Sequence, residues 1–324
     1  MRPRDLLLLS ALAILFSARA TPIAEAVEKA WRLGVLSLVD TPAVAHSTIL
    51  SELAKKGFVE GQNLVVDMRI GPTQQMPALA RELVSARPDV IMAISDWAVY
   101  PARDATRSIP IVAAPMGADP VAAGVAESWA RPGGNVTGVT LIAPDLEVKR
   151  LDLLRQVVPT ARRVAMLSMH REVTEPGEAP VRSAAASLGI TLVELYIERI
   201  DELREAFAEM RSTGAEALVI VSVPEFAVHA ATLAELSMGA GLPTVCGNYR
   251  TAEQGCLIGY GPNFAELTRQ AADYIARLLS GASPAELPIV GPTHYQLVIN
   301  LKTAKALGLT VPPSILARAD EVIE

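Results

Sequence analysis

The sequence has few of the residues that most enzyme and metal sites need. Among its 324 residues are four histidines and two cysteines, and neither type has the spacing of a metal site. The nucleophile-elbow, zinc-protease, P-loop, dithiol and dinucleotide-binding motifs are all missing. We therefore expect a protein that binds a molecule without metal or cofactor and has no catalytic residue, and we keep an exported enzyme only as an alternative.

Charge and hydropathy exclude further classes of protein. The formal net charge is −6, and no basic stripe indicates a nucleic-acid partner. The composition of 51% apolar and 20% charged residues is typical of a globular core and not of a disordered chain. The longest apolar run, residues 6–16, is shorter than the roughly 20 residues that a membrane-spanning helix needs.

That apolar run belongs to a pattern typical of a signal peptide. Arg2 and Arg4 precede the run, and Ala18-Arg19-Ala20 follows it as a small-residue cleavage site. We expect cleavage after Ala20 and a periplasmic location for the mature chain. An uncleaved membrane anchor is the alternative interpretation.

Beyond the signal peptide, apolar strand patterns alternate with helical patterns in two successive series. The first series places strands at 33–38, 64–68, 90–94, 111–114 and 136–141, and the second at 164–167, 192–195, 218–221, 244–246 and 257–260. Continuous apolar strands separated by helices indicate parallel sheets that are covered on both faces. We therefore predict an α/β fold with two doubly wound lobes around a central cleft.

The connections between the predicted lobes are short. We expect crossings near 143–144, 261–262 and 288–292, with 32–141 plus 263–286 in the first lobe and 142–262 plus 287–324 in the second. Several short crossings form a hinge, so the lobes should close on a ligand that touches both.

Candidate site residues follow the predicted strands, where open α/β sheets bind their ligands. They are Asp40, Ser95, Asp96, Trp97 and Asp119 in the first half, and His170, Glu225, Asn248 and Tyr249 in the second. Helix N-termini there would attract a carboxylate, acidic side chains an ammonium group and aromatic rings an apolar body. Alternatives stay open: Asp40 as a turn residue, Asp96, Asp119 and Glu225 as helix caps, Trp97 as a core residue and His170 as a surface residue.

The two cysteines lie close together in the sequence. Cys246 ends one predicted strand and Cys256 begins the next. If these strands are parallel, the two sulfur atoms lie at opposite ends of the sheet. We therefore expect free thiols, with a disulfide as the alternative.

Five segments resemble one known family. They are 57–63 (GFVEGQN), 130–138 (ARPGGNVTG), 259–263 (GYGPN), 298–309 (VINLKTAKALGL) and 319–323 (ADEVI). From about Arg32 to Glu324, the chain resembles the substrate-binding proteins of ABC transporters whose characterised members bind tryptophan, phenylalanine or tyrosine. The resemblance implies a type I-like periplasmic-binding architecture and an ABC permease in the inner membrane as partner.

The resemblance also implies where a ligand would bind. By position, the ligand loops of the family fall on 95–97 and 119–120 in the first lobe and on 169–170, 225 and 248–249 in the second. The chain departs from the family pattern with Asp96-Trp97 where small residues are common, Met169-His170 where Asn-Pro is common and Cys256 where glycine is usual. We expect a monomeric receptor for a small molecule, such as an amino acid or a related carboxylate. The alternative is an extracytoplasmic sensory module that signals to a membrane-bound partner.

Overall fold

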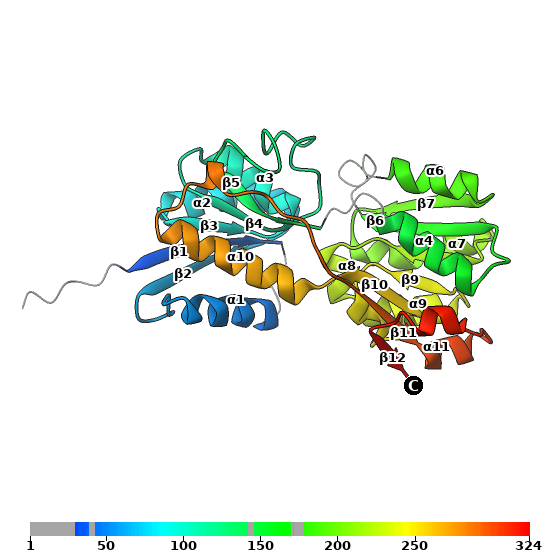
Figure 1. Cartoon of the computed structure of the whole chain (residues 1–324). Helices are drawn as coiled ribbons and strands as arrows, with labels where there is room; N and C mark the ends of the chain where they lie inside the picture. Colours follow the sequence, from blue (N-terminus) through cyan, green and yellow to red (C-terminus); the bar gives the residue numbers. More distant parts are fainter. Residues whose placement is uncertain (1–29, 39–42, 142–145, 170, 172–177) are drawn as a thin grey trace, which may run out of the picture.

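Two separate β-sheets, each with helices on both faces, divide the chain into two lobes (Figure 1). The computed structural model describes residues 30–38, 43–141, 146–169, 171 and 178–324. The predicted signal peptide, Asp40 and His170 lie outside the described residues. Within these ranges, no helix is both long and apolar enough to cross a membrane.

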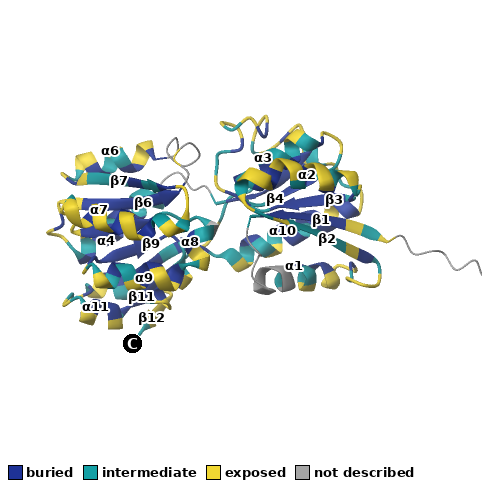
Figure 2. Ribbon diagram, turned by 180° about the vertical axis from the view of Figure 1, so that it is seen from behind, coloured by how far each residue is buried: buried dark blue, intermediate teal, exposed yellow. Residues whose placement is uncertain are grey.

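The first sheet is parallel throughout, as the continuous apolar runs predict, and its strand order is β2-β1-β3-β4-β5. Its strands are β1 (Trp31–Ser37), β2 (Leu64–Ile70), β3 (Val90–Ala93), β4 (Ile111–Met116) and β5 (Val136–Thr140). The accompanying helices are α1 (Ala43–Lys55), η1 (Thr73–Gln75), α2 (Met76–Ser85) and α3 (Asp96–Ala105). Because helices cover both faces, β3 and β5 are buried along their whole length (Figure 2).

The second sheet is larger, with the strand order β12-β11-β10-β9-β8-β6-β7. Its strands are β6 (Arg163–Met169), β7 (Thr191–Ile197), β8 (Ala217–Ile220), β9 (Thr244–Cys246), β10 (Ile258–Pro262), β11 (Tyr295–Asn300) and β12 (Glu321–Ile323). The helices are α4 (Leu146–Val157), α6 (Ala179–Ser187), η3 (Ile200–Glu202), α7 (Leu203–Ser212), α8 (Pro224–Val228), α9 (Ala230–Gly239), η4 (Tyr249–Ala252), α11 (Leu301–Ala306) and α12 (Pro313–Leu316).

One pair of strands in the second sheet departs from the parallel arrangement. β10 and β11 are antiparallel, with Pro262 opposite Tyr295. The chain leaves this sheet at the end of β10 and returns beside the same end, where the Asn263 amide donates to the His294 carbonyl oxygen at 3.1 Å. β11 must therefore run back along β10, whereas the other paired strands of this sheet are parallel.

Helix α10 (Phe264–Leu279) follows the second sheet in sequence but packs on the first (Figure 1). Its N-terminus is capped by Asn263, whose side-chain oxygen accepts a hydrogen bond from the Glu266 amide at 3.2 Å. One strongly apolar face of this helix, including Leu267 and Ile275, is buried in the core of the first lobe.

The segment after α10 stays beside the first sheet. A short turn, η5 (Pro284–Glu286), leads to Val290, whose amide donates to the Gly138 carbonyl oxygen at 3.1 Å. Residues 287–290 therefore lie next to β5, although the predicted lobe limits assign them to the second lobe. The third crossing follows Val290.

The expectation of two free thiols is wrong. Cys246 and Cys256 form a disulfide, with their Cα atoms 6.5 Å apart, within the limit of about 7 Å for such a bond. β9 and β10 are parallel as predicted, but Cys256 precedes β10 and its sulfur lies 3.2 Å from the Thr244 carbonyl oxygen. Because β9 has only three residues, the start and the end of this strand are close enough for the bridge.

Candidate functional site

Ser95 holds a strained backbone conformation at the junction of β3 and α3. Its φ of 74° and ψ of 164° fall in a region that only glycine adopts easily. The residue is 7% exposed, and its buried hydroxyl oxygen has no hydrogen-bond partner among the described residues. Such conformations cost about 1–3 kcal/mol and concentrate at ligand sites. The strain and the unpaired hydroxyl both support Ser95 as a site residue.

Asp96 binds the loop that follows β4 in place of capping its own helix. The side chain is 6% exposed, and its carboxylate accepts hydrogen bonds from the amides of Gly117 at 2.9 Å and Ala118 at 3.0 Å. Burial raises the pKa of Asp96 above its usual value, although the two amides favour the charged form. A Cβ atom at Gly117 would lie 2.9 Å from the Asp96 carboxylate, so glycine permits this close approach.

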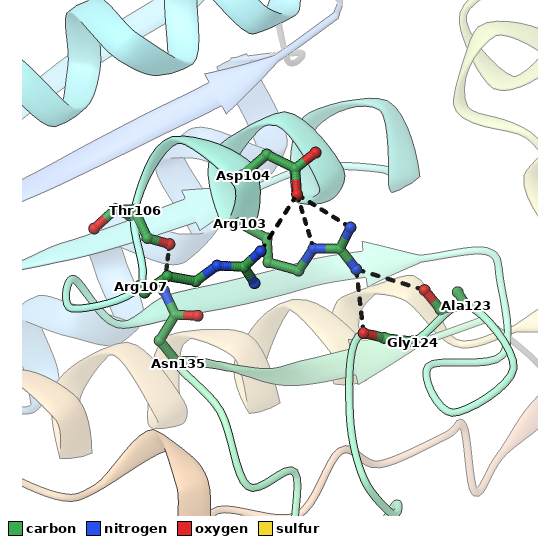
Figure 3. A network of polar contacts seen from close by, with 7 residues as sticks. All are labelled: Arg103, Asp104, Thr106, Arg107, Ala123, Gly124 and Asn135. Carbon is green, nitrogen blue, oxygen red and sulfur yellow. Dashed lines mark hydrogen bonds and ion pairs between the residues drawn. The ribbon is translucent and has the colours of Figure 1, made fainter.

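The loop that Asp96 holds is fixed again at its far end by helix α3. Arg103, in the last turn of the helix, donates to the carbonyl oxygens of Ala123 at 3.5 Å and Gly124 at 3.2 Å (Figure 3). The same guanidinium pairs with Asp104 at 3.1 Å. One helix therefore positions both ends of the segment 117–124.

Asp119 lies in this loop and Trp97 lies in α3, and both are half-buried. One carboxylate oxygen of Asp119 accepts hydrogen bonds from the amides of Val121 at 2.8 Å and Ala122 at 3.0 Å. Asp119 therefore caps a turn, and no helix follows it in the described segment before β5, so it is not the helix cap of the alternative given above. Trp97 is in the first turn of α3, where its neighbours Asp96 and Ala98 are buried.

The second lobe presents polar groups after β8 and β9. A small hollow there is lined by Ser222, Phe226, Gly247 and Asn248, among others. The Asn248 side-chain oxygen accepts a hydrogen bond from the Arg250 amide at 3.0 Å and so caps η4. Tyr249 is half-buried in the same loop.

Glu225 belongs to the short helix α8 beside this hollow and is half-buried. In the parts of the chain that the structure describes, its carboxylate has no hydrogen-bond or ion-pair partner.

The loop 247–255, which carries Asn248 and Tyr249, is anchored on several sides. The disulfide joins its two ends. The Asn300 amide group donates to the Ala252 carbonyl oxygen at 2.8 Å, and the Thr303 hydroxyl donates to the Gly255 carbonyl oxygen at 2.9 Å. The segment 298–309 thus has a structural role, because its Asn300 and Thr303 side chains hold the candidate ligand loop in place.

Arg150 is a supporting residue that the sequence analysis missed. Its guanidinium is fully buried and donates to the carbonyl oxygens of Tyr260 at 2.9 Å and Gly247 at 3.0 Å, while it pairs with Glu147. Burial raises the pKa of Glu147. In the sequence this pair is an ordinary i,i+3 pair on a charged helix, so no local signal separates it from a surface ion pair.

The structure thus collects the described candidates into two groups. Ser95, Asp96, Trp97 and Asp119 lie around the carboxyl ends of β3 and β4, while Glu225, Asn248 and Tyr249 lie after β8 and β9. Among the described residues, no group of three or more histidine, cysteine or acidic side chains could hold a metal ion.

The comparisons with known proteins agree on one protein family. The family described as "ABC transporter substrate binding protein" matches residues 32–323. A tyrosine-binding protein of Clostridioides difficile is 26% identical over 293 residues, which cover 87% of this chain and 82% of that protein.

Two solved structures have the same fold. An ABC domain from Streptococcus pneumonia in complex with L-Trp superposes with a TM-score of 0.82 at 23% identity, over 90% of this chain and 99% of that one. A conserved domain protein from Vibrio cholerae superposes with a TM-score of 0.79 at 27% identity, over 91% of this chain and 100% of that one. The architecture is the two-lobed, type I-like periplasmic-binding fold.

Proposed function

Because this chain belongs to the family of ABC transporter substrate-binding proteins, we propose that it is an extracytoplasmic receptor that closes on a small molecule and delivers it to an ABC permease. The family consists of binding proteins and not of enzymes. The observation that carries the proposal is the pair of site groups, one at the carboxyl ends of each sheet. A ligand that contacts both groups would stabilise a closed arrangement of the lobes.

An amino acid is the ligand class that we favour. A relative is described as tyrosine-binding, and another is described in complex with L-Trp. The half-buried rings of Trp97 and Tyr249 offer one aromatic surface from each lobe. The Glu225 carboxylate, which has no partner among the described residues, would accept a hydrogen bond from an ammonium group.

The decisive experiment identifies what the protein carries. Purified protein is denatured, and the small molecules it releases are identified by mass spectrometry. Small-angle scattering with and without the identified molecule then measures closure. A smaller radius of gyration at saturation is expected, and an unchanged radius would contradict the hinge.

A periplasmic location is part of the same proposal. It rests on the signal-peptide pattern of residues 1–20 and predicts a mature chain that starts at Thr21. N-terminal sequencing of protein from the periplasmic fraction tests it, and an intact Met1 would contradict it.

A further inference from the structure

We propose that Asp96 occupies the anion-binding groups of the first lobe, so that this lobe receives a cationic group of the ligand and not its carboxylate. The inference rests on the proposed function, because it concerns the same site and names the chemistry of the ligand there.

Free backbone amides at the carboxyl ends of strands normally form an anion-binding concavity. The N-terminus of a helix adds positive potential to such a place. Here only Ile94 and Ser95 separate β3 from α3, and the amides of Gly117 and Ala118 directly follow β4. Without an internal partner, these two amides would suit a ligand carboxylate.

Asp96 supplies that internal partner. Each of its carboxylate oxygens accepts a hydrogen bond from one amide, at 2.9 Å from Gly117 and 3.0 Å from Ala118. Arg103 holds the far end of the same loop, so the two amides cannot turn toward a ligand without breaking these contacts. A ligand carboxylate would also meet the negative charge of Asp96.

The polar side chains that remain for a ligand include hydrogen-bond acceptors, and a hydroxyl such as that of Ser95 can both accept and donate. The Ser95 hydroxyl oxygen is buried without a partner among the described residues. Among the described candidates of both lobes, three are acidic, namely Asp96, Asp119 and Glu225, and none is basic. Acceptor atoms and negative charge together select an ammonium or another N–H-rich cationic group.

The first experiment needs no knowledge of the ligand. Acetate is titrated into the protein while the amide resonances of Gly117 and Ala118 are followed by NMR. We expect no acetate-dependent shift in the wild type and a saturable shift of both resonances in Asp96→Ala. Asp89→Ala is the matched control, because Asp89 also accepts a hydrogen bond from a backbone amide, that of Arg32 at 2.8 Å, but lies before β3, and it should leave Gly117 and Ala118 unresponsive.

Two outcomes would overturn the inference: an acetate-dependent shift of both amides in the wild type, or no such shift in folded Asp96→Ala. Asp96→Asn serves if the alanine variant does not fold. Its amide oxygen accepts a hydrogen bond from one backbone N–H, and its amino group cannot accept the other. That variant should therefore show the acetate response at one of the two amides, and a response at neither would also count against the inference.

The second experiment compares aromatic probes by calorimetry: L-tyrosine, tyramine, which lacks the carboxylate, and hydroxyphenylpropionate, which lacks the amine. We expect the two amines to bind and the acid to bind at least about tenfold more weakly, because it loses a charge-assisted hydrogen bond. Asp96→Asn should weaken tyramine by about ten- to a hundredfold. Tighter binding of the acid than of tyramine would contradict the inference. Failure of all three probes would reject an aromatic ligand, and the acetate experiment would still decide the role of Asp96.

Discussion

The Arg150 guanidinium and the Tyr260 carbonyl oxygen are joined by a hydrogen bond of 2.9 Å between helix α4 and strand β10. α4 begins after the first crossing, and Tyr260 lies two residues before the end of β10, where the second crossing starts. The Tyr260 ring stacks on that of Tyr295, which begins β11 after the third crossing, with ring centroids 5.9 Å apart. One cluster of a buried arginine and two half-buried tyrosines therefore links the chain near all three crossings on the side of the second lobe.

Removing the charge of Arg150 should destabilise this lobe strongly. Arg150→Met leaves the half-buried Glu147 carboxylate without its partner, and we expect the free energy of unfolding to fall by about 3 kcal/mol in urea titrations. Arg155→Met on the same helix is the control; its partly exposed side chain should change stability by less than about 0.5 kcal/mol. The double variant Glu147→Gln/Arg150→Met should recover part of the loss, and a double variant no more stable than Arg150→Met would contradict the role of the pair.

Glycine at position 95 should relieve backbone strain. Because Ser95 has a φ of 74°, Ser95→Gly is expected to raise the free energy of unfolding by about 1 kcal/mol. Ser95→Ala is the matched control, since it removes the hydroxyl and keeps the strain. Thermal melts of both variants measure the difference. Equal stability of the two variants would show that the backbone strain is not significant.

The disulfide should be present in protein that has not been exposed to a reductant. Thiol counting on the unfolded chain is expected to find no free thiol, and two after reduction. Cys246→Ala/Cys256→Ala should lose about 2–3 kcal/mol of stability, because the short loop is no longer closed in the unfolded state. We also expect weaker ligand binding, since this loop carries Asn248 and Tyr249. Two free thiols before reduction would rule out the bridge.

The stability of the protein should depend on pH through Asp96. Burial raises the pKa of Asp96, so the folded chain keeps this proton at pH values where the unfolded chain has lost it. The contribution of this group is complete below the unfolded pKa of about 3.9 and is lost as the pH rises through the higher folded pKa. Urea titrations across this range should show wild type losing stability relative to Asp96→Asn as the pH rises. A difference that does not change with pH would contradict the shift.

Trp97 should report ligand binding by its fluorescence. Its ring is half-buried, whereas Trp31 packs on Phe58 in the first lobe with ring centroids 6.0 Å apart. Trp97→Phe should therefore abolish most of the ligand-induced change, while Trp31→Phe should preserve it. A Trp97→Phe protein with the full change would place Trp97 outside the site.

The regular part of the fold could be predicted because its signals are local. Apolar runs such as 90–94 and 218–221 match β3 and β8 within one residue. The reversal at β11 was missed because it depends on where the chain returns from the other lobe. The disulfide was missed because strand direction was considered without the turn before Cys256.

The candidate site stays a prediction, and the sequence indicates which strands its residues follow but not the contacts that they make. Ser95 and Asp96 were found because they follow a buried strand. Nothing near Asp96 in the sequence indicates that its partners are the amides of Gly117 and Ala118, 21 and 22 residues later. Arg150 was missed for the same reason, since its partners at Gly247 and Tyr260 are 97 and 110 residues away.

The position of α10 in the chain also limits the order of folding. The first lobe is the first to emerge during synthesis, yet part of its core comes from α10, which ends at Leu279. The second sheet in turn needs β11 and β12 near the C-terminus. Neither lobe is complete before most of the chain has been made, so a polypeptide cut at residue 262 would leave both lobes unfinished. Until then the nascent chain would stay incompletely folded, so chaperones could bind it and it could pass through a narrow channel.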